Sequence, residues 1–541
     1  MEELKGERMS RRCWNKFGSE SLFAQYSPFF VSLAAGNLSP HAIGKFIYQD
    51  RQFLKVIFSA YVEAAKNCVN DDCEKMIIKH LKISAFHRIS VYEELVKEWG
   101  LEFPEEPTCF VSIDDYRCLL TDTATGKVEG KQVDCNRKIA AYTLGAIVPK
   151  MRLYSHLFHQ IWTIQDPSHT PHIYNKWIDH YSSQDFEVSL FQNEYLMDKF
   201  SHHLTEEEVE VMEKLYHQAL KLQIEFFAEL PTHMQALVPL FRSQDLGTQL
   251  TVFCDFDMTC TIAESTAILA GASIAVSEFY QIPSAGLRRK LRVLSNQCSE
   301  EFEECFKRIE SSVQGQQVFD VDGLLSALEQ VAEGEMRANE RVSELRLFQG
   351  LSLEYIELAA SIIILQKGCR EFFRKIAENK TPNIDVHVIS YCWCGDLIRS
   401  VLSPEVSIFN VHSNELAYNK GWTTGDIWRR VETSFDKFRF FTEIKNCCKT
   451  ETEHMTVYIG GDVGDLLCLL AADIGIVVGS SNPNLMRMGH HFGVKFLPLF
   501  PALVQKWKFF SKGSSVIWGS DSGIIYTVSC WTEIEAFIMG M

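Results

Sequence analysis

Two carboxylates, Asp255 and Asp257, stand two residues apart directly after a short apolar run, 251–254. Acids at this spacing can act on one point: one can attack phosphorus, and the other can protonate the leaving oxygen and then activate water. The pair also suits Mg²⁺, a hard cation that prefers oxygen ligands and offsets the charge of a phosphate. Because Asp-x-Asp also occurs in solvated loops, the motif alone leaves phosphoryl transfer and a surface loop equally open.

Three polar groups farther along the chain extend this pattern. Ser390 follows a second short apolar run, Lys437 lies in Ser-Phe-Asp-Lys, and Asp465 lies in a loop after a third apolar run. Together with Asp255 and Asp257, these positions resemble the haloacid dehalogenase (HAD) superfamily of phosphatases. The resemblance implies that Asp255 is the nucleophile and Asp257 the general acid/base. It also implies that Ser390 hydrogen-bonds the phosphoryl group, that Lys437 balances the aspartyl-phosphate charge, and that Asp465 belongs to the metal loop.

The acidic loop departs from the family pattern. The family has an Asp directly after the strand, where this chain has Gly461, and the acid stands one residue later, at Asp462. A shift of one residue moves a carboxylate by about 3.5 Å, which is more than Mg²⁺ coordination tolerates. Three alternatives stay open: the loop bends differently, Asp465 takes the place of the missing metal ligand, or the affinity for the metal is weakened. The expected Mg²⁺ ligands are Asp255, Asp257, Asp462 and Asp465.

The elements around these residues read as a parallel α/β sheet. Short apolar runs at 251–254, 386–389, 455–459 and 474–478 are each followed by small or acidic residues and then by a helical pattern. Chemistry in such sheets lies at the carboxyl ends of the strands. The resemblance gives this half an HAD-like Rossmannoid sheet, with the helical stretch 266–379 as a cap over the site.

The first 230 residues read as almost entirely helical, with apolar residues at spacings of three and four. Helices are expected to start at Pro40 and to cover roughly 72–99, 136–161, 172–200 and 205–230. Asp50 lies on the apolar stripe of the first of these helices, and Glu225 lies at the edge of another stripe. Two acids near a helical core are costly unless they are paired or used. They are either hydrogen-bonded core residues or the site of a small basic ligand such as an aminopyrimidine.

This half resembles the TenA (thiaminase II-like) family, a haem-oxygenase-like helical bundle. The motifs that carry the resemblance are Tyr48-Gln-Asp50, Gly145-Ala-Ile-Val-Pro149, Tyr174-Asn-Lys-Trp177-Ile-Asp-His-Tyr181 and the Glu225 helix. By position, Asp50 would bind the aminopyrimidine, Glu225 would act as acid/base, and Tyr154 and Tyr181 would line the pocket. Lys150 stands where the family has its nucleophilic cysteine. It is either a nucleophile with a lowered pKa or a sign that C–N cleavage is lost or altered.

The expected domains are a TenA-like domain at 1–230, a linker at 231–249 with two prolines, and an HAD-like domain at 250–541. The HAD core would be 250–265 and 380–541. The order TenA then HAD resembles a plant family of bifunctional proteins of thiamin metabolism. That resemblance implies a Mg²⁺-dependent phosphatase that converts thiamin monophosphate to thiamin. It also implies a homo-oligomer formed through the TenA-like domain.

Two other functions stay open. One is an aminopyrimidine salvage hydrolase with a weak phosphatase half. The other is a non-catalytic protein that binds pyrimidines or oligomerises, with a disabled metal loop.

Composition limits the partners and the compartment. The 541 residues contain 53 Lys and Arg against 70 Asp and Glu, a net charge of −17. This balance argues against nucleic acids and anionic membranes, which need a basic face. The first sixteen residues lack the apolar core of a signal peptide, and the cysteines are scattered singly. A cytoplasmic protein is therefore expected, or a mitochondrial one if a longer N-terminus exists.

Overall fold

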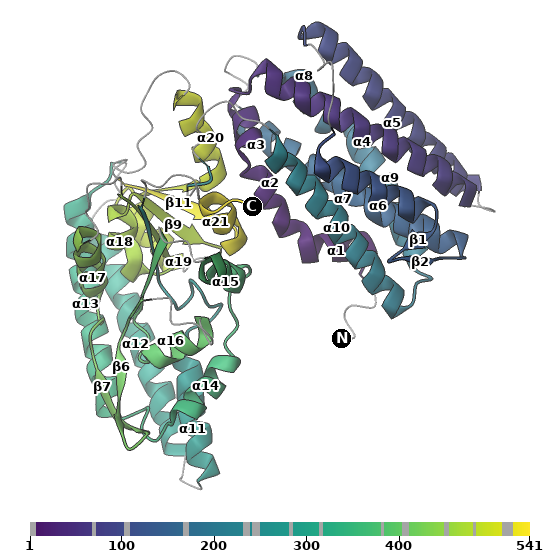
Figure 1. Cartoon of the computed structure of the whole chain (residues 1–541). Helices are drawn as coiled ribbons and strands as arrows, with labels where there is room; N and C mark the ends of the chain where they lie inside the picture. The colour runs from purple at the N-terminus through teal and green to yellow at the C-terminus, as the bar shows by residue number, and fades with distance from the viewer. Residues whose placement is uncertain are drawn as a thin grey trace. The chain divides into compact units, whose positions relative to one another are not determined.

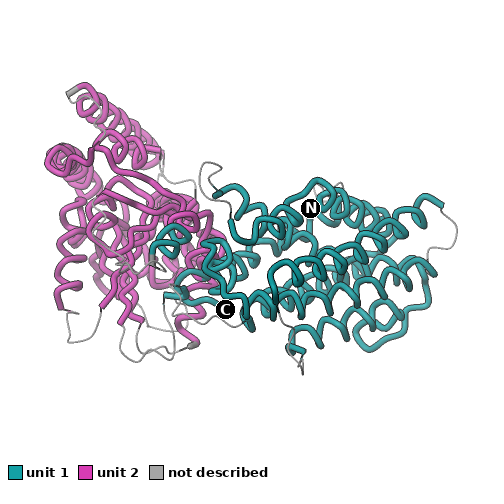
Figure 2. The backbone as a smooth tube through the Cα atoms, turned by 90° about the horizontal axis from the view of Figure 1, so that it is seen from above, with its two compact units in different colours: residues 1–240, 503–515, 536–541 teal, residues 241–502, 516–535 magenta. Residues whose placement is uncertain are grey.

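The computed structural model describes residues 7–67, 72–101, 109–165, 172–230, 238–240, 249–280, 285–312, 318–379, 384–402, 410–447, 454–479, 483–510 and 523–541. The chain forms two compact units (Figure 2). The first comprises 1–240 with 503–515 and 536–541, and the second comprises 241–502 with 516–535. The predicted linker, 231–249, lies outside the described residues apart from 238–240 and 249. None of the described helices is both long and apolar enough to span a bilayer.

The first unit is a bundle of helices that lie side by side (Figure 1). α4 packs against α5, and α7 packs against both α9 and α10. Pro40 begins α4, and the Ser39 hydroxyl accepts from the Ala42 N–H at 3.2 Å, as the sequence predicted. The elements are α1 (Met9–Phe17), η2 (Gly18–Glu20), α2 (Ser21–Gln25), α3 (Pro28–Ala35), α4 (Pro40–Asn67), α5 (Asp72–Glu98), α6 (Val111–Ala124), β1 (Lys127–Val128), β2 (Lys131–Gln132), α7 (Asn136–Ile164), α8 (Asn175–Tyr181), α9 (Gln184–Ser201) and α10 (Glu206–Glu229).

One predicted helix of this unit is interrupted. The pattern over 172–200 is divided into α8 and α9. Ser183 separates them, because its hydroxyl caps α9 by accepting from the Phe186 N–H at 3.2 Å. The apolar periodicity continues across the break, and for that reason the pattern alone predicted a single helix.

The second unit is built on a seven-stranded sheet in the order β10-β11-β9-β8-β3-β4-β5, and every strand pair is parallel. β3 lies between β8 and β4 in the interior of the sheet and is almost wholly buried, as parallel strands covered by helices usually are. The strands are β3 (Gln249–Cys254), β4 (Ile384–Ile389), β5 (Asn410–His412), β8 (His454–Gly460), β9 (Ile474–Val478), β10 (Lys495–Pro498) and β11 (Ile524–Val528), with a separate hairpin of β6 (Glu415–Asn419) and β7 (Trp422–Trp428).

The helices between β3 and β4 form the predicted cap, and two of them also build the core. Phe306 on α12 and Leu328 on α13 share one buried cluster with Phe253 and Tyr458 of the sheet. The cap is therefore anchored on the sheet. The helices of this unit are α11 (Ser265–Phe279), α12 (Ala285–Ser312), α13 (Val321–Glu344), α14 (Leu353–Ser361), α15 (Cys369–Asn379), α16 (Gly395–Leu402), α17 (Ser434–Cys447), η3 (Val463–Asp465), α18 (Leu466–Ala471), α19 (Pro483–His491), α20 (Leu499–Phe510) and α21 (Trp531–Ile538).

Candidate active site

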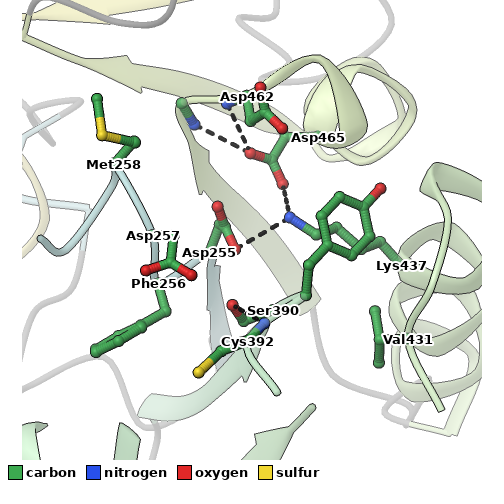
Figure 3. A network of polar contacts seen from close by, with 12 residues as sticks. Asp255, Phe256, Asp257, Met258, Ser390, Cys392, Val431, Lys437, Asp462 and Asp465 are labelled. Atoms are coloured by element: carbon green, nitrogen blue, oxygen red, sulfur yellow. Dashed lines mark hydrogen bonds and ion pairs between the residues drawn. The ribbon is translucent and has the colours of Figure 1, made fainter. Parts of the chain in front are cut away.

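The sheet register brings three loops to one edge. Cys254 at the end of β3 is level with Val388 on β4 and with Ile459 on β8. Asp255, Ser390 and the loop after Gly460 therefore leave the sheet side by side, at its carboxyl edge. Figure 3 shows their side chains gathered there. The predicted convergence of these motifs follows from the pairing of three neighbouring strands.

A buried lysine joins two of the loops. The Lys437 ammonium lies 3.0 Å from Asp255 Oδ1 and 2.8 Å from Asp465 Oδ1, and all three side chains are almost wholly inaccessible to solvent. Burial alone would lower the pKa of Lys437, but the two carboxylates raise it above its ordinary value. Lys437 is therefore charged at neutral pH. It contacts Asp255, the predicted nucleophile.

The proposed nucleophile and the proposed acid have different surroundings. Burial raises the pKa of Asp255 well above its ordinary value, and Lys437 opposes that rise. Burial also raises the pKa of Asp257, to about 6, although its hydrogen bonds with Ser265 act against the rise. A carboxyl with a pKa near 6 can give and take a proton close to neutral pH, as a general acid/base requires.

Asp257 is positioned by a residue that the sequence did not single out. Its Oδ1 accepts from the Ser265 N–H at 2.7 Å, and its Oδ2 accepts from the Ser265 hydroxyl at 2.9 Å. Ser265 begins α11, so the carboxyl is anchored to the first residue of a helix. The intervening loop turns at Met258, which adopts the left-handed region with φ 59°. A non-glycine residue with positive φ is uncommon and often marks a functional loop.

The acidic loop after β8 explains the one-residue departure from the family. The Gly461 backbone lies so close to the Asp255–Asp257 loop that an added Cβ would stand 2.9 Å from the Met258 carbonyl oxygen. Position 461 has no room for a side chain, whereas Asp462 lines the cavity beside Asp255. The loop therefore presents its acid from the next residue.

Asp465 is the anchor of this loop. Its Oδ1 accepts from Lys437 and, at 2.9 Å, from the Tyr458 hydroxyl, while its Oδ2 accepts from the N–H groups of Gly461 and Asp462 at 3.0 Å each. Four donors occupy this carboxylate. Asp465 is therefore placed to hold the loop in shape, and its predicted role as a metal ligand is not what the geometry favours.

Two of the four predicted metal ligands, Asp255 and Asp462, suit a hard divalent cation at this edge of the sheet. Asp255 and Asp462 both line the cavity, and carboxylate oxygens are the ligands that Mg²⁺ prefers. The carboxylates of Asp257 and Asp465, the other two predicted ligands, are held by the donors described above. Within the described ranges, no three His, Cys, Asp or Glu side chains are already gathered as a metal centre would require.

A cavity of about 240 Å³ opens above these residues. Ser390, fully buried at the tip of β4, lies on its floor. The sequence missed the residues that the cap and the neighbouring loops contribute, because they become neighbours of the site only in the fold. The lining comprises Asp255, Asp257, Met258, Glu264, Thr266, Glu335, Ala338, Asn339, Ser390, Tyr391, Trp393, Glu432 and Asp462.

In the first unit, Asp50 is wholly buried and belongs to a closed polar network. Its carboxylate accepts from the hydroxyls of Tyr92, Tyr154 and Tyr181, at 2.5, 2.8 and 3.2 Å. The Lys150 ammonium forms an ion pair with the same carboxylate. Burial lowers the pKa of Lys150 to about 8, although Asp50 opposes the shift. The predicted ligand-binding acid is therefore paired with the residue that replaces the family cysteine.

The structure corrects the placement of Glu225. Four of the five residues predicted for this pocket meet, but Glu225 is half-buried, and burial together with Glu229 raises its pKa. Gln223, two residues earlier on α10, faces the network, with its Oε1 3.5 Å from the Lys150 ammonium. Residues two apart lie about 200° apart around a helix. The side chain that reaches Lys150 from this helix is thus an amide.

The fold and the two sites place the chain in one class of protein, in which a TenA-like helical unit is joined to an HAD-like phosphatase unit. The sequence resemblance predicted this class. No family model matches the chain. The "Bifunctional TH2 protein, mitochondrial" of Arabidopsis thaliana is 41% identical over 556 residues, which cover 99% of this chain and 90% of the relative. The chain belongs to the family of this bifunctional protein. The name of the relative contradicts the prediction of a cytoplasmic protein.

Solved structures resemble each half of the chain. A TenA homologue from Pyrococcus furiosus is 14% identical, with a TM-score of 0.34, and covers 40% of this chain and 98% of its own. A phospho-aspartyl intermediate analogue of phosphoserine phosphatase is 19% identical, with a TM-score of 0.27, and covers 45% of this chain and 91% of its own.

Proposed function

We propose that the second unit is a Mg²⁺-dependent phosphatase that hydrolyses thiamin monophosphate through an aspartyl-phosphate on Asp255. The observation that carries the proposal is the buried Asp255–Lys437–Asp465 cluster, because its Asp255 lines a cavity together with Asp257 and Ser390. Family membership supports the choice of substrate, because the wider resemblance is to bifunctional proteins of thiamin metabolism. We extend the mitochondrial location of the relative to this chain as part of the same proposal.

The residues divide the reaction into two steps. In the first, an Asp255 oxygen forms a bond to phosphorus while the bond from phosphorus to the thiamin oxygen breaks, and Asp257 gives its proton to that oxygen. In the second, Asp257 takes a proton from water as the water attacks phosphorus, which releases phosphate and restores Asp255. Ser390 donates a hydrogen bond to the phosphoryl group, and Lys437 offsets its charge.

The cation has a defined place in this proposal. Asp255 and Asp462 are the residues that would hold Mg²⁺, and Asp465 would keep the Asp462 loop in place. When bound, the cation supplies positive charge that lets the anionic phosphate approach a carboxylate. The residues of the chain do the remaining work: they hold the nucleophile, deliver the proton and donate hydrogen bonds.

The test is phosphate release from thiamin monophosphate by the purified full chain, with Mg²⁺ and with chelator. Asp255→Asn is the test variant, and Asp322→Asn, which removes an exposed acid from α13, is its matched control. Metal-dependent release that only Asp255→Asn abolishes supports the proposal. Equal release by Asp255→Asn, or full activity in chelator, contradicts it.

The rival function, hydrolysis of an aminopyrimidine by the first unit, finds less support. A basic pyrimidine would have to displace the Lys150 ammonium from Asp50, and an amide, Gln223, stands at the network instead of an acid/base. The homo-oligomer stays a prediction. Ammonia release from an aminopyrimidine, lost in Asp50→Asn, would restore the rival.

A further inference from the structure

The cavity that holds the proposed phosphatase site has an unusual charge balance. Six of its lining residues are acidic, and no Lys, Arg or His is among the described lining. Three of these acids, Asp255, Asp257 and Asp462, belong to the phosphoryl-transfer edge. The other three come from the loop before α11, from α13 and from the segment after β7. A phosphate ester entering this cavity would therefore meet acids beyond those that the reaction uses.

Among these last three acids, Glu335 has a buried oxygen without a hydrogen-bond donor: no described residue donates a hydrogen bond to its Oε2. The other two acids differ from Glu335. Glu432 accepts a hydrogen bond from the Arg429 guanidinium at 3.1 Å, and Glu264 is exposed at the rim of the cavity. An isolated buried carboxylate is unfavourable unless a charge or a donor meets it. Burial raises the pKa of Glu335 to about 8, and Asp462 adds to the rise. A positive group of a bound molecule beside Glu335 would favour its charged form.

Glu335 lies on α13, in the cap, and Asp462 and Lys437 are the charges that act on it most strongly. Glu335, Ala338 and Asn339 lie at i, i+3 and i+4 of α13, and so they share one face of that helix. The Trp393 ring, 8% exposed, also lines the cavity. An aromatic face and a carboxylate together are the surroundings in which an organic cation is bound most strongly.

We propose that the cavity selects phosphomonoesters whose leaving alcohol carries a positive charge, and that Glu335 is the residue that reads this charge. The proposal rests on the phosphatase function proposed above and deepens it. The phosphoryl group would lie against Asp255 and Ser390, with Lys437 paired to Asp255. The cationic ring or ammonium of the alcohol would face Glu335 and Trp393. A neutral alcohol of the same shape would leave the Glu335 carboxylate unpaired.

The test compares thiamin monophosphate with its 3-deaza analogue, in which a neutral thiophene replaces the thiazolium ring at nearly constant shape. kcat/KM for both esters is measured with the full chain, with Glu335→Gln, and with Glu333→Gln, an exposed acid two residues away. We expect wild type and Glu333→Gln to prefer the cationic ester by about tenfold or more. Glu335→Gln should bring the two values within about threefold, by losing activity on the cationic ester alone.

The outcomes separate the two proposals. Hydrolysis of neither ester refutes the phosphatase function itself. Equal hydrolysis of both by wild type, or a preference that survives in Glu335→Gln, refutes the charge-reading role and leaves the phosphatase function standing. An equal loss on both esters, together with a raised Mg²⁺ requirement, would show that Glu335 serves the cation and would also overturn the proposal. A thermal midpoint of Glu335→Gln at or above that of wild type excludes misfolding, because the variant removes an unpaired buried acid.

Discussion

Replacing Lys437 with Met tests whether one buried cation holds the proposed site together. The change keeps most of the side-chain volume and removes the ammonium that lies 3.0 Å from Asp255 and 2.8 Å from Asp465. Removing one partner of a buried ion pair costs about 3–5 kcal/mol, because the remaining charge is left uncompensated. We therefore expect the free energy of unfolding to fall by that amount at pH 8 and phosphatase activity to be lost.

The pH dependence of this loss identifies its cause. Without Lys437, burial raises the pKa of Asp255 in the folded protein further above its unfolded value of about 3.9. The folded variant then binds more protons than the unfolded chain, so its stability decreases as pH rises from the unfolded pKa to the folded one. One such carboxyl contributes about 1.4 kcal/mol per pH unit. The difference in unfolding free energy between Lys437→Met and wild type should therefore be markedly smaller at pH 5.5 than at pH 8.

Urea unfolding of the full chain at pH 5.5 and pH 8.0 measures both quantities. The matched control is Arg439→Met on the same helix, because Arg439 pairs with Asp436 at 3.2 Å in an exposed position and such pairs contribute at most about 1 kcal/mol. The reasoning would be refuted if Lys437→Met lost no more unfolding free energy than Arg439→Met. It would also be refuted if the loss in Lys437→Met were the same at pH 5.5 and pH 8.0.

Three further predictions follow from the site and the network. Asp257→Asn should slow turnover of thiamin monophosphate by about 10²–10⁴-fold. In single-turnover experiments, the rate of phosphoryl transfer in the wild type should decline above about pH 6, where Asp257 loses its proton. The Asp257→Asn variant should lack this decline. Gly461→Ala should lower stability by about 1–3 kcal/mol, because its Cβ would meet the Met258 carbonyl; an unchanged melting temperature would contradict this. Lys150→Met should destabilise the first unit by about 3–5 kcal/mol, and adding Asp50→Asn should recover much of the loss in urea unfolding; additive losses would contradict the buried pairing.

The carboxyl edge of the sheet could be predicted because its signals are local. β3, β4 and β8 are short apolar runs that end at functional residues, and parallel strands place such ends together. Lys437 was identified through the family pattern, and its contact with Asp255 agrees with that assignment. Ser265 and Glu335 could not be found in this way, because each approaches the site from a helix of the cap, whose packing no sequence spacing encodes.

The two remaining discrepancies have different causes. Gly461 carries no acid because the Met258 carbonyl leaves no room for a side chain, and this contact exists only in the folded loop. Glu225 was chosen from the edge of an apolar stripe, but Gln223, about 200° away around the helix, is the residue that faces Lys150. Periodicity defines the middle of a buried face more reliably than its border.

Chemical trapping at Asp255 is the measurement that tests the phosphatase proposal most directly. The full chain is mixed with thiamin monophosphate and Mg²⁺, quenched in acid, and treated with borohydride, which reduces an aspartyl phosphate to homoserine. We expect mass spectrometry to find homoserine at position 255 and at no other aspartate. Phosphate release without modification at that position, or modification at another acid, would contradict the assignment of Asp255 as the nucleophile.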